Sequence, residues 1–407
     1  MLTDELKISL KKQKQIYERQ LILNPVENCP FPDILEPCSS FLHGLYNTDT
    51  CKSNEQKFQS KIQFSGRNDI TDDVQKIYRA WEKLLDAERI SMRLLSGLHA
   101  HTVLFMGLSS IGDKVMILPE KAGGHVSGKA ILQRLGLIVK DIPYDLQNMC
   151  IDHQKYIISY NEFKPDFVFI DRSEGLIYED FTWLCSVTDC YKIFDASQYL
   201  TNIIAGDYMN PFKMGFDLIL STMHKNLPGP QRALVAVKKA NSTWENLRSA
   251  ISTYVSNMHV FSIYSAGLLL EHLNELKSLS NTMLENAILL EKNLVMNGIP
   301  VIERQTNVKN PPTHHCWIKP PTQEKAFQLY LDLEKLGILT NYRLLPYDIG
   351  YGLRLGLSGA SMSGLKPKDI SDLSTFISMA YYEGYSEKLS EDICHFIKNI
   401  KGRQITI

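Results

Sequence analysis

A lysine beside a histidine occupies a polar turn between two apolar segments of this chain. The first segment, residues 217–220, leads into Ser221-Thr-Met-His-Lys225, and the second spans residues 233–237. A lysine at the tip of a buried strand loses solvation, and this loss favours the neutral, nucleophilic amine. Lys225 is therefore a candidate nucleophile toward a carbonyl group, although an ordinary exposed turn lysine would have the same local sequence.

Polar side chains follow other apolar segments in the same manner. Asp195 and Ser173 each come just after such a segment, and His125 ends the turn Ala122-Gly-Gly-His125. Asp195 could equally cap a turn, and His125 could lie on the surface. Together with Lys225 and the turn Ser96-Gly97, these residue types suit pyridoxal phosphate. A lysine forms the Schiff base, an aspartate pairs with the pyridinium nitrogen, and a helix N-terminus holds the phosphate.

Strand-like and helix-like segments alternate around these residues. Such alternation predicts an α/β fold whose mostly parallel, three-layer sheet binds ligands at the carboxyl ends of its strands. A helix ending near Ala87 is expected to begin at Thr71 or Asp72, either of which could cap it. We expect strands at residues 114–118, 137–139, 167–170, 192–194, 217–220 and 233–237, and helices at residues 99–110 and 126–135.

The chain is expected to have three parts. Residues 1–50 are interpreted as an N-terminal arm, residues 51–290 as a large α/β domain that binds the cofactor, and residues 291–407 as a small α+β domain. A leucine-rich helical pattern over residues 260–296 predicts a bridging helix between the two domains. At about 150 residues per domain, the length suits two domains with extensions.

Composition excludes several classes of function. The chain has 407 residues, of which 22% are charged, and its formal net charge is −1, which argues against a nucleic-acid or polybasic membrane partner. No apolar run approaches the roughly 18 residues that span a bilayer. The eight cysteines are scattered without a C-x-x-C pair, which predicts free thiols in the cytoplasm and no metal site. The charged stretch Met1–Gln20 has no apolar core of a secretory signal.

The lysine turn and four further motifs resemble the serine hydroxymethyltransferase family of fold-type-I pyridoxal-phosphate enzymes. The stretch Ser221–Pro230 is similar to its T-T-T-H-K-T-L-x-G-P lysine motif. The other matches occur in the family's order, so the resemblance covers residues 24–357. They are Asn24-Pro-Val-Glu-Asn28 with A-S-E-N, Ala122-Gly-Gly-His125 with H-G-G-H, Phe194-Asp-Ala196 with the start of V-D-x-A-H, and Gly352-Leu-Arg-Leu-Gly356 with G-I-R-x-G.

The resemblance implies a role for each matching residue. Lys225 would form the Schiff base, Asp195 would pair with the pyridinium nitrogen, and His125 would stack on the cofactor ring. Arg354 would hold the substrate carboxylate, and Tyr46 would lie near the substrate in a site completed by the second subunit of a homodimer. The remaining implied cofactor contacts are Gly97, Leu98, His99, Ser173, Gln198, Thr222 and His224, with Ser256 and Asn257 toward the other subunit's phosphate.

Departures from the family pattern lie around the substrate. Thr48 stands at the position of the family's catalytic glutamate, with Asp49 one residue out of register, and Phe64 replaces a tyrosine. Arg343 replaces an amide in the segment that holds the pterin of folate, while Glu27 of the A-S-E-N motif is kept. These differences put the use of tetrahydrofolate in doubt.

The sequence therefore favours a folate-independent aldolase or transaldolase that acts at the α-carbon of an amino acid, with an aldehyde as the possible second substrate. Phe64 and Arg343 could reshape the pocket for a larger or anionic aldehyde. One alternative is true hydroxymethyl transfer, with Asp49 or Glu27 substituting for the missing glutamate. Others are transamination, decarboxylation or oxidation on the same cofactor, and a binding protein with little catalysis.

Overall fold

The chain forms two compact units. The computed structural model describes residues 2–48, 53–60, 62–307 and 309–402. The larger unit comprises Pro30–Ser278 and Asn307–Pro311. The smaller unit comprises Met1–Cys29, Leu279–Thr306 and Pro312–Ile407. These ranges differ from the predicted ones, because the first 29 residues group with the C-terminal region and residues 30–50 with the larger unit.

Helices and strands alternate through most of the larger unit. Its strands are β2 (Arg89–Leu94), β3 (Lys114–Ile117), β4 (Ile138–Asp141), β5 (Tyr144–Asp145), β6 (Cys150–Ile151), β7 (Phe167–Ile170), β8 (Tyr191–Asp195), β9 (Leu218–Thr222) and β10 (Ala233–Val237). Its helices are η1 (Asp33–Ser39), η2 (Phe41–Gly44), α2 (Asn54–Gln59), α3 (Asn68–Leu85), α4 (Gly97–Leu108), η3 (Glu120–Ala122), α5 (Gly128–Arg134), α6 (His153–Phe163), α7 (Thr182–Ser186), α8 (Leu200–Ala205), α9 (Pro211–Met214), α10 (Ser242–Tyr254), α11 (Val260–Leu268) and η4 (Leu269–His272).

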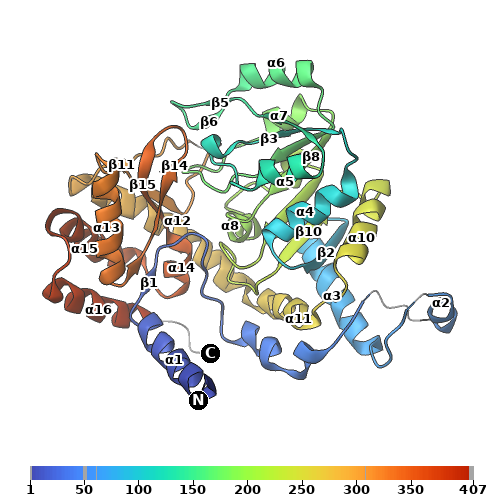
Figure 1. Cartoon of the computed structure of the whole chain (residues 1–407), viewed down its shortest axis with the longest axis horizontal. Coiled ribbons are helices and arrows are strands. Elements are labelled where there is room, and N and C mark those ends of the chain that lie inside the picture. The colour runs from blue at the N-terminus through green and yellow to red at the C-terminus, as the bar shows by residue number, and fades with distance from the viewer. Residues whose placement is uncertain (1, 49–52, 61, 308, 403–407) are drawn as a thin grey trace. The chain divides into compact units, whose positions relative to one another are not determined.

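A mostly parallel sheet forms the centre of the larger unit (Figure 1). Among the described residues, seven strands join it in the order β2-β10-β9-β8-β7-β3-β4. Strands β9, β8, β7, β3 and β4 run parallel, whereas β10 is antiparallel to both β9 and β2. The carboxyl ends of the parallel strands therefore lie along one edge, where open α/β sheets bind their ligands.

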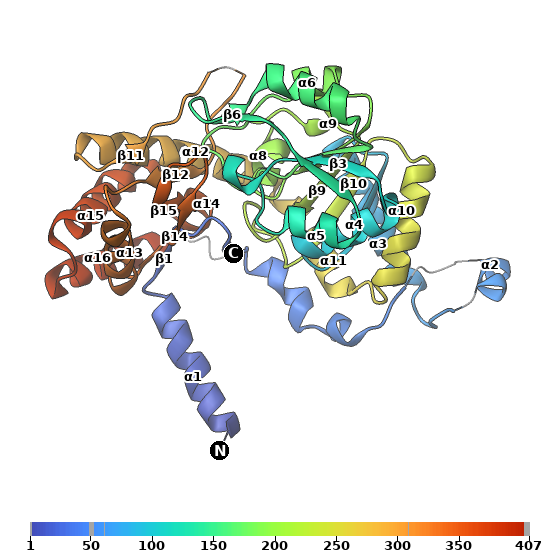
Figure 2. The same cartoon turned by 45° about the horizontal axis from the view of Figure 1, so that its top comes forward.

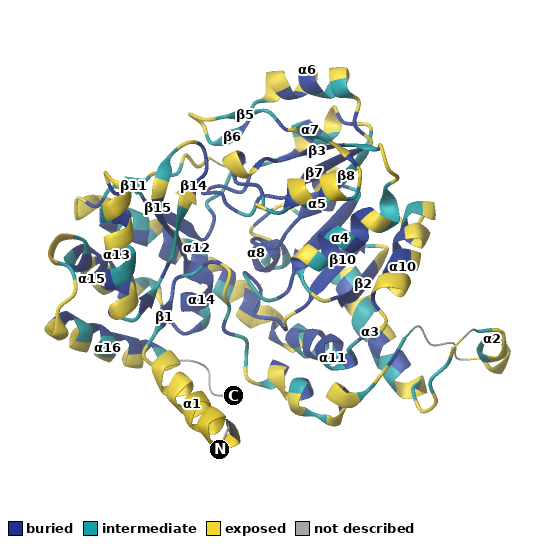
Figure 3. Ribbon diagram, viewed as in Figure 1, coloured by how far each residue is buried: buried dark blue, intermediate teal, exposed yellow. Residues whose placement is uncertain are grey.

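Apolar side chains of three helices cover one face of this sheet. Helices α4, α5 and α10 pack in one core with residues from β3, β7, β8, β9 and β10, and the three helices lie on the same side in both views (Figure 1, Figure 2). Strands β7, β9 and β10 are buried on both faces, as runs such as Phe167–Ile170 predict for a parallel sheet, whereas the edge strand β4 is partly exposed. Figure 3 shows this burial along the strands. The predicted α/β fold is confirmed.

Two predicted helix boundaries need correction. Helix α3 begins at Asn68, before the expected cap at Thr71 or Asp72. Thr71 lies inside the helix, where its hydroxyl donates to the Arg67 carbonyl at 2.8 Å, so it bonds back along the helix instead of capping it. The predicted bridging helix is divided by the 3₁₀ turn η4, beyond which α12 (Leu273–Met296) follows.

The smaller unit is built around an antiparallel sheet. In the part of the chain that the structure describes, its four strands follow the order β11-β12-β15-β14. A short parallel pair, β1 with β13, joins residues 21–22 to residues 338–339, which explains why the N-terminal residues belong to this unit. The elements are α1 (Leu2–Tyr17), β1 (Leu21–Ile22), the greater part of α12, β11 (Val301–Ile302), β12 (His315–Ile318), α13 (Gln323–Lys335), β13 (Ile338–Leu339), β14 (Asn341–Leu345), β15 (Gly350–Gly356), α14 (Leu357–Met362), η5 (Pro367–Asp369), α15 (Ile370–Glu383) and α16 (Glu387–Lys401). None of the described helices combines the length and apolarity needed to cross a membrane.

Replacing a core phenylalanine tests the packing of α4 on the sheet. Phe105 is 0% exposed and lies 5.5 Å, ring centre to ring centre, from Phe169. We expect Phe105→Ala to lower the free energy of unfolding by about 3–5 kcal/mol, because the cavity left behind cannot be filled. Denaturant titration measures this change. The control Phe58→Ala, at a side chain that is 91% exposed, should stay within about 0.5 kcal/mol of the parent, and equal effects of the two variants would contradict the assigned core.

Candidate active site

A cavity of about 170 Å³ opens at the carboxyl edge of the parallel strands. Residues from α4, from the η3–α5 turn, and from the ends of β8 and β9 line it. They are Ser96, Gly97, Leu98, His101, His125, Asp195, Ser197, Thr222, His224 and Lys225. The strand-end rule thus brings together the lysine, the aspartate and the glycine turn that the sequence suggested.

Lys225 follows β9 by three residues and is half-buried in this cavity. The buried groups His101, Asp171 and Asp195 all experience the charge of its ammonium group. The neighbouring His224 is half-buried, and burial lowers the pKa of its imidazole, so the ring is neutral at neutral pH. The amine therefore faces a cavity whose buried carboxylates balance its charge.

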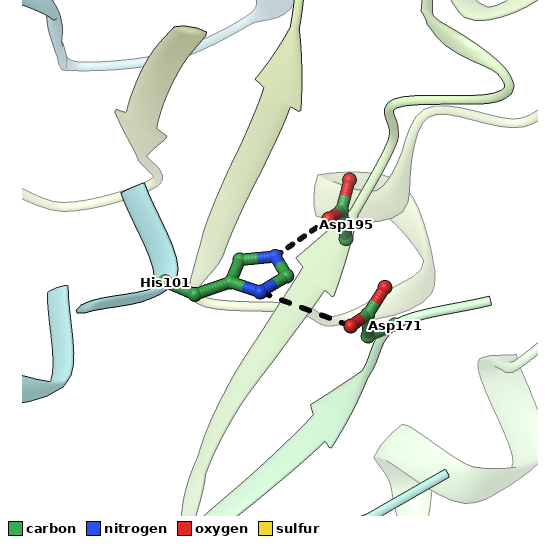
Figure 4. A group of neighbouring side chains, drawn as sticks. All are labelled: His101, Asp171 and Asp195. Carbon is green, nitrogen blue, oxygen red and sulfur yellow. Dashed lines mark hydrogen bonds and ion pairs between the residues drawn. The ribbon is translucent and has the colours of Figure 1, made fainter. Parts of the chain in front are cut away.

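Asp195, the last residue of β8, is held through both carboxylate oxygens. Its Oδ1 accepts from the Ser197 backbone N–H at 2.8 Å, and its Oδ2 lies 2.8 Å from Nε2 of His101 (Figure 4). On the other side of the imidazole, Nδ1 lies 3.9 Å from Oδ2 of Asp171. All three side chains are buried. A carboxylate, an imidazole and a second carboxylate thus form a row, of which Asp195 and His101 also line the cavity.

The charges in this row depend on one another. Burial by itself would lower the pKa of His101, but the charge of Asp171 and the hydrogen bond and charge of Asp195 outweigh burial and raise it. Burial raises the pKa of Asp171 to about 7, against the opposing charge of His101. Burial also acts to raise the pKa of Asp195, yet its hydrogen bonds and nearby positive charges lower it overall. Asp195 is therefore the ionised carboxylate of the row, and a proton is retained on its neighbours.

The same three side chains could in principle share a cation, because their ligand atoms lie within 4.8 Å of one another. A direct hydrogen bond already joins His101 to Asp195, and a metal ion between those atoms would have to break it. The hydrogen bond gives His101 Nε2 and Asp195 Oδ2 a partner without a metal ion. It also leaves Asp195 able to accept a hydrogen bond from a ligand in the cavity. The expectation that the protein uses no metal stays a prediction.

His125 lines the cavity from the turn before α5. Its Nδ1 accepts from the Ser127 backbone N–H at 3.2 Å, which places the proton of the neutral ring on Nε2. Its ring is perpendicular to that of His101, with 6.0 Å between the ring centres. The contact with Ser127 fixes one edge of the imidazole, which lines the cavity.

The N-terminus of α4 and the end of β9 provide a place for an anionic group. Ser96 caps α4 by accepting from the His99 backbone N–H at 3.2 Å, and Gly97 is the first helical residue. A Cβ atom at Gly97 would lie 2.8 Å from Cγ2 of Thr222, so only glycine fits there. The Thr222 Oγ1 is buried and has no hydrogen-bond partner among the described residues. A helix N-terminus, a required glycine and an unsatisfied hydroxyl at one end of the cavity fit the phosphate of pyridoxal phosphate.

Three predicted cofactor residues do not line the cavity. His99 uses Nδ1 to accept from the Leu95 backbone N–H at 3.1 Å. The Ser173 hydroxyl donates to Asp171 Oδ1 at 3.5 Å, so it supports the buried row from behind. Gln198 is 2% exposed, and its Oε1 has no hydrogen-bond partner within the part of the chain that the structure describes. None of these three residues lines the cavity.

A second cluster in the larger unit holds four other predicted residues. The Tyr46 hydroxyl is hydrogen bonded to the Ser256 hydroxyl, and the Tyr46 ring lies 5.0 Å from that of Phe64. Asn257 Oδ1 accepts from the Asn47 backbone N–H at 3.1 Å, and Asn257 Nδ2 donates to the Leu45 carbonyl at 3.3 Å. None of these side chains lines the cavity around Lys225. Thr48, which follows Asn47 in the chain, is half-buried, whereas Asp49 lies outside the described residues.

The predicted substrate residues Arg354, Glu27 and Arg343 belong to the smaller unit. Arg354 is buried on β15, and its Nε donates to Asn341 Oδ1 at 3.2 Å. Glu27 accepts from the Asn24 amide at 2.6 Å and lines a cavity of about 400 Å³ together with Asn341 and Thr340. Arg343 donates to the Leu344 carbonyl at 3.2 Å and does not line that cavity.

Sequence reasoning missed His101 and Asp171. Asp171 follows β7 directly, so the rule that selected Asp195 would also have selected it. His101 stands inside an apolar helical segment, where a lone histidine carries no signal of its own. Only the register of α4 against the strand ends identifies it.

A single methyl group at Gly97 tests the anionic end of the cavity. We expect Gly97→Ala to weaken pyridoxal-phosphate binding by more than about tenfold, because its Cβ would displace Thr222. The same crowding should lower the free energy of unfolding by about 1–3 kcal/mol, so binding is compared under conditions in which the variant is folded. Equilibrium titration with the cofactor and denaturant unfolding measure the two quantities. The control Gly44→Ala, where no atom lies within 4 Å of the added Cβ, should bind normally; normal binding by Gly97→Ala would remove this part of the assignment.

Comparisons with known proteins agree with the geometry. A family model described as serine hydroxymethyltransferase matches residues 3–377. The serine hydroxymethyltransferase of Pyrobaculum arsenaticum is 25% identical over 342 residues, which cover 81% of this chain and 78% of the relative. That of Pyrococcus furiosus is 28% identical over 337 residues, covering 77% of each chain.

A solved structure shares the fold over nearly the whole chain. The crystal structure of L-threonine transaldolase from Pseudomonas fluorescens, in an internal aldimine state, superposes with a TM-score of 0.88. It covers 98% of this chain and 92% of its own at 22% identity. The fold is that of the fold-type-I pyridoxal-phosphate enzymes, and pyridoxal phosphate is the cofactor that the family match supports. The family match covers most of the chain, and we conclude that the protein belongs to the serine hydroxymethyltransferase family and is a pyridoxal-phosphate-dependent enzyme.

Proposed function

We propose that this enzyme is a folate-independent aldolase or transaldolase that forms or breaks a bond at the α-carbon of an amino acid. One observation carries the proposal. The cofactor-holding positions Lys225, Asp195 and His125 are kept and lie around one cavity, whereas Thr48 occupies the position of the family's catalytic glutamate. A threonine hydroxyl cannot act as the carboxylate base of that reaction. The L-threonine transaldolase with the same fold illustrates that this architecture is compatible with such chemistry.

Pyridoxal phosphate, when bound, supplies an electron sink for the charge that develops at the amino-acid α-carbon. The residues of the chain hold and orient it. Lys225 offers the amine that would carry the cofactor, and Asp195, ionised and fixed at both oxygens, would accept a hydrogen bond from the pyridinium N–H. His125, which the Ser127 backbone N–H holds at Nδ1, would stack on the cofactor ring. Thr222 and the N-terminus of α4 would hold the phosphate.

Arg354 would bind the carboxylate of the substrate. The Asn341 amide fixes its Nε, so the plane of the guanidinium is set before a ligand arrives. Such a planar fork binds a carboxylate through two parallel hydrogen bonds, which a lysine cannot reproduce. Burial of Arg354 strengthens this interaction, because little water competes for the guanidinium.

The cluster around Tyr46 would act in the second subunit of a homodimer. Tyr46, Phe64, Ser256 and Asn257 support one another but do not line the cavity of their own chain. The family resemblance assigns these positions to the neighbouring subunit's site. With Phe64 in place of a tyrosine, the substrate would meet an apolar ring, which favours an acceptor aldehyde with an apolar group.

Hydroxymethyl transfer is the second candidate, and Glu27 favours it. This carboxylate lines a cavity of about 400 Å³ whose size suits part of a folate-like molecule. Its hydrogen bond to Asn24 holds it in one orientation. Glu27 would then replace the missing family glutamate as the base.

Substrate tests separate the two candidates. The purified holoenzyme is incubated with glycine, serine or threonine, each with and without tetrahydrofolate, and with an aldehyde acceptor. We expect threonine or another β-hydroxy amino acid to be cleaved or exchanged at the same rate with and without tetrahydrofolate, and Lys225→Ala to be inactive. Product analysis by mass spectrometry measures the exchange. Serine turnover that requires tetrahydrofolate and is lost in Glu27→Gln would reject the folate-independent reaction in favour of hydroxymethyl transfer.

Exchanging the arginine for a lysine tests how the substrate carboxylate is bound. We expect Arg354→Lys to raise the KM for the amino acid about 100-fold, because the two parallel hydrogen bonds are lost. The visible absorbance of the bound cofactor should be unchanged, since Arg354 lies outside the cavity around Lys225. Steady-state kinetics measure the effect, with the exposed Arg248→Lys as the control. An unchanged KM in Arg354→Lys would show that another group binds the carboxylate.

A further inference from the structure

The row Asp195–His101–Asp171 contains more buried polar groups than the contact with the cofactor requires. A single aspartate is enough to pair with a pyridinium nitrogen. Here the His101 and Asp171 side chains, 3% and 1% exposed, lie behind it. His101 Nδ1 and Asp171 Oδ2 face each other at 3.9 Å, and neither has a hydrogen-bond partner among the residues that the structure describes. Buried polar atoms without hydrogen-bond partners destabilise a fold, so the presence of these two atoms side by side calls for a functional explanation.

The hydrogen bonds to Asp195 fix the orientation of its carboxylate. Ser197 donates to Oδ1 from one side, and His101 Nε2 contacts Oδ2 from the other. The two contacts come from different elements, the turn after β8 and the middle of α4. Rotation of the carboxylate would break at least one of them. The remaining acceptor capacity of Asp195 is therefore directed into the cavity that Lys225 lines.

Every charged or titratable group that faces His101 bears on its protonation. Asp171 follows β7, Asp195 ends β8, Lys225 follows β9, and His125 precedes α5 with its ring 6.0 Å away. The two carboxylates are the nearest of these groups. Together they raise the pKa of His101 by more than burial and the positive charge of Lys225 lower it. A doubly protonated imidazole suits both flanking carboxylates. Its Nε2–H donates a hydrogen bond to Asp195, and its positive charge faces the carboxylate of Asp171. A neutral ring with its single proton on Nδ1 would instead turn a lone pair toward Asp195.

We propose that His101 and Asp171 are positioning residues for Asp195, in which the imidazole aims the carboxylate at the cofactor ring nitrogen and Asp171 keeps the imidazole protonated. This inference rests on the proposed role of Asp195 as the partner of that nitrogen. Neither His101 nor Asp171 needs to touch the cofactor. Their contribution is to the orientation and charge of the one group that does.

The apoenzyme provides the first test, which requires no cofactor. With histidines labelled at Cε1, NMR follows the titration of each imidazole, and the signal missing in His101→Ala identifies His101. We expect the titration midpoint of His101 to fall by at least about one pH unit in Asp171→Asn, because the opposing negative charge is lost. An unchanged midpoint would overturn the part assigned to Asp171.

The holoenzyme provides the second test. We expect His101→Ala to weaken pyridoxal-phosphate binding by about tenfold to one hundredfold, because a charge-assisted hydrogen bond to Asp195 is lost. His101→Gln, which keeps a side-chain N–H donor, should recover part of this loss. Affinity in His101→Ala equal to that of its control would overturn the role of His101. Absence of binding by the parent protein would instead reject the proposed cofactor role of Asp195, while the NMR result still decides whether Asp171 controls His101.

A second histidine–aspartate pair in the same unit supplies matched controls. His272 Nε2 lies 2.8 Å from Asp33 Oδ2, the same separation as in the His101–Asp195 pair. His272 is also buried, whereas the Asp33 side chain is 30% exposed. This pair does not line the cavity around Lys225. His272→Ala and Asp33→Asn therefore report the general cost of breaking such a contact, and both should bind pyridoxal phosphate like the parent protein.

Discussion

Parallel pairing of β7, β8 and β9 is the constraint on which the site depends. Because these strands run in the same direction, the residues that follow them meet at one edge of the sheet. Asp171 and Lys225 follow β7 and β9, and Asp195 is the last residue of β8, so two acids and an amine share one small region. The helices on the sheet then complete the arrangement, since α4 presents Gly97 at its first turn and His101 one turn later. A change in strand order would separate all of these groups.

The electrostatics follow from this convergence. A half-buried lysine, a buried histidine and two buried carboxylates could not coexist as isolated charges, because each would be costly to remove from water. Together their charges compensate one another, but the two carboxyl groups differ in pKa. Asp195 stays ionised, whereas burial raises the pKa of Asp171 to about 7. Such separation of two carboxyl groups by environment is how an active site assigns them different roles. Here one would contact the cofactor and the other would support it.

Most of the fold could be predicted from the sequence, because buried parallel strands have unmistakable apolar runs. Strands β7 and β10 have the predicted bounds, and the residues after the strands gave Lys225 and Asp195. His101 could not be predicted, since its place depends on the rotation of α4 against the sheet. The grouping of the N-terminal residues with the smaller unit also escaped prediction. It depends on a two-residue strand, β1, whose partner β13 lies more than 300 residues away.

The central claim is that Lys225 carries pyridoxal phosphate in the cavity that Asp195 helps to form. Reduction of the holoenzyme with borohydride, followed by proteolysis and mass spectrometry, tests this claim directly, because reduction makes the bond between the lysine and the cofactor permanent. The account predicts one phosphopyridoxyl group per chain, on the peptide that contains Lys225. A label on a different lysine, or no label on a protein that has been saturated with the cofactor, would contradict it.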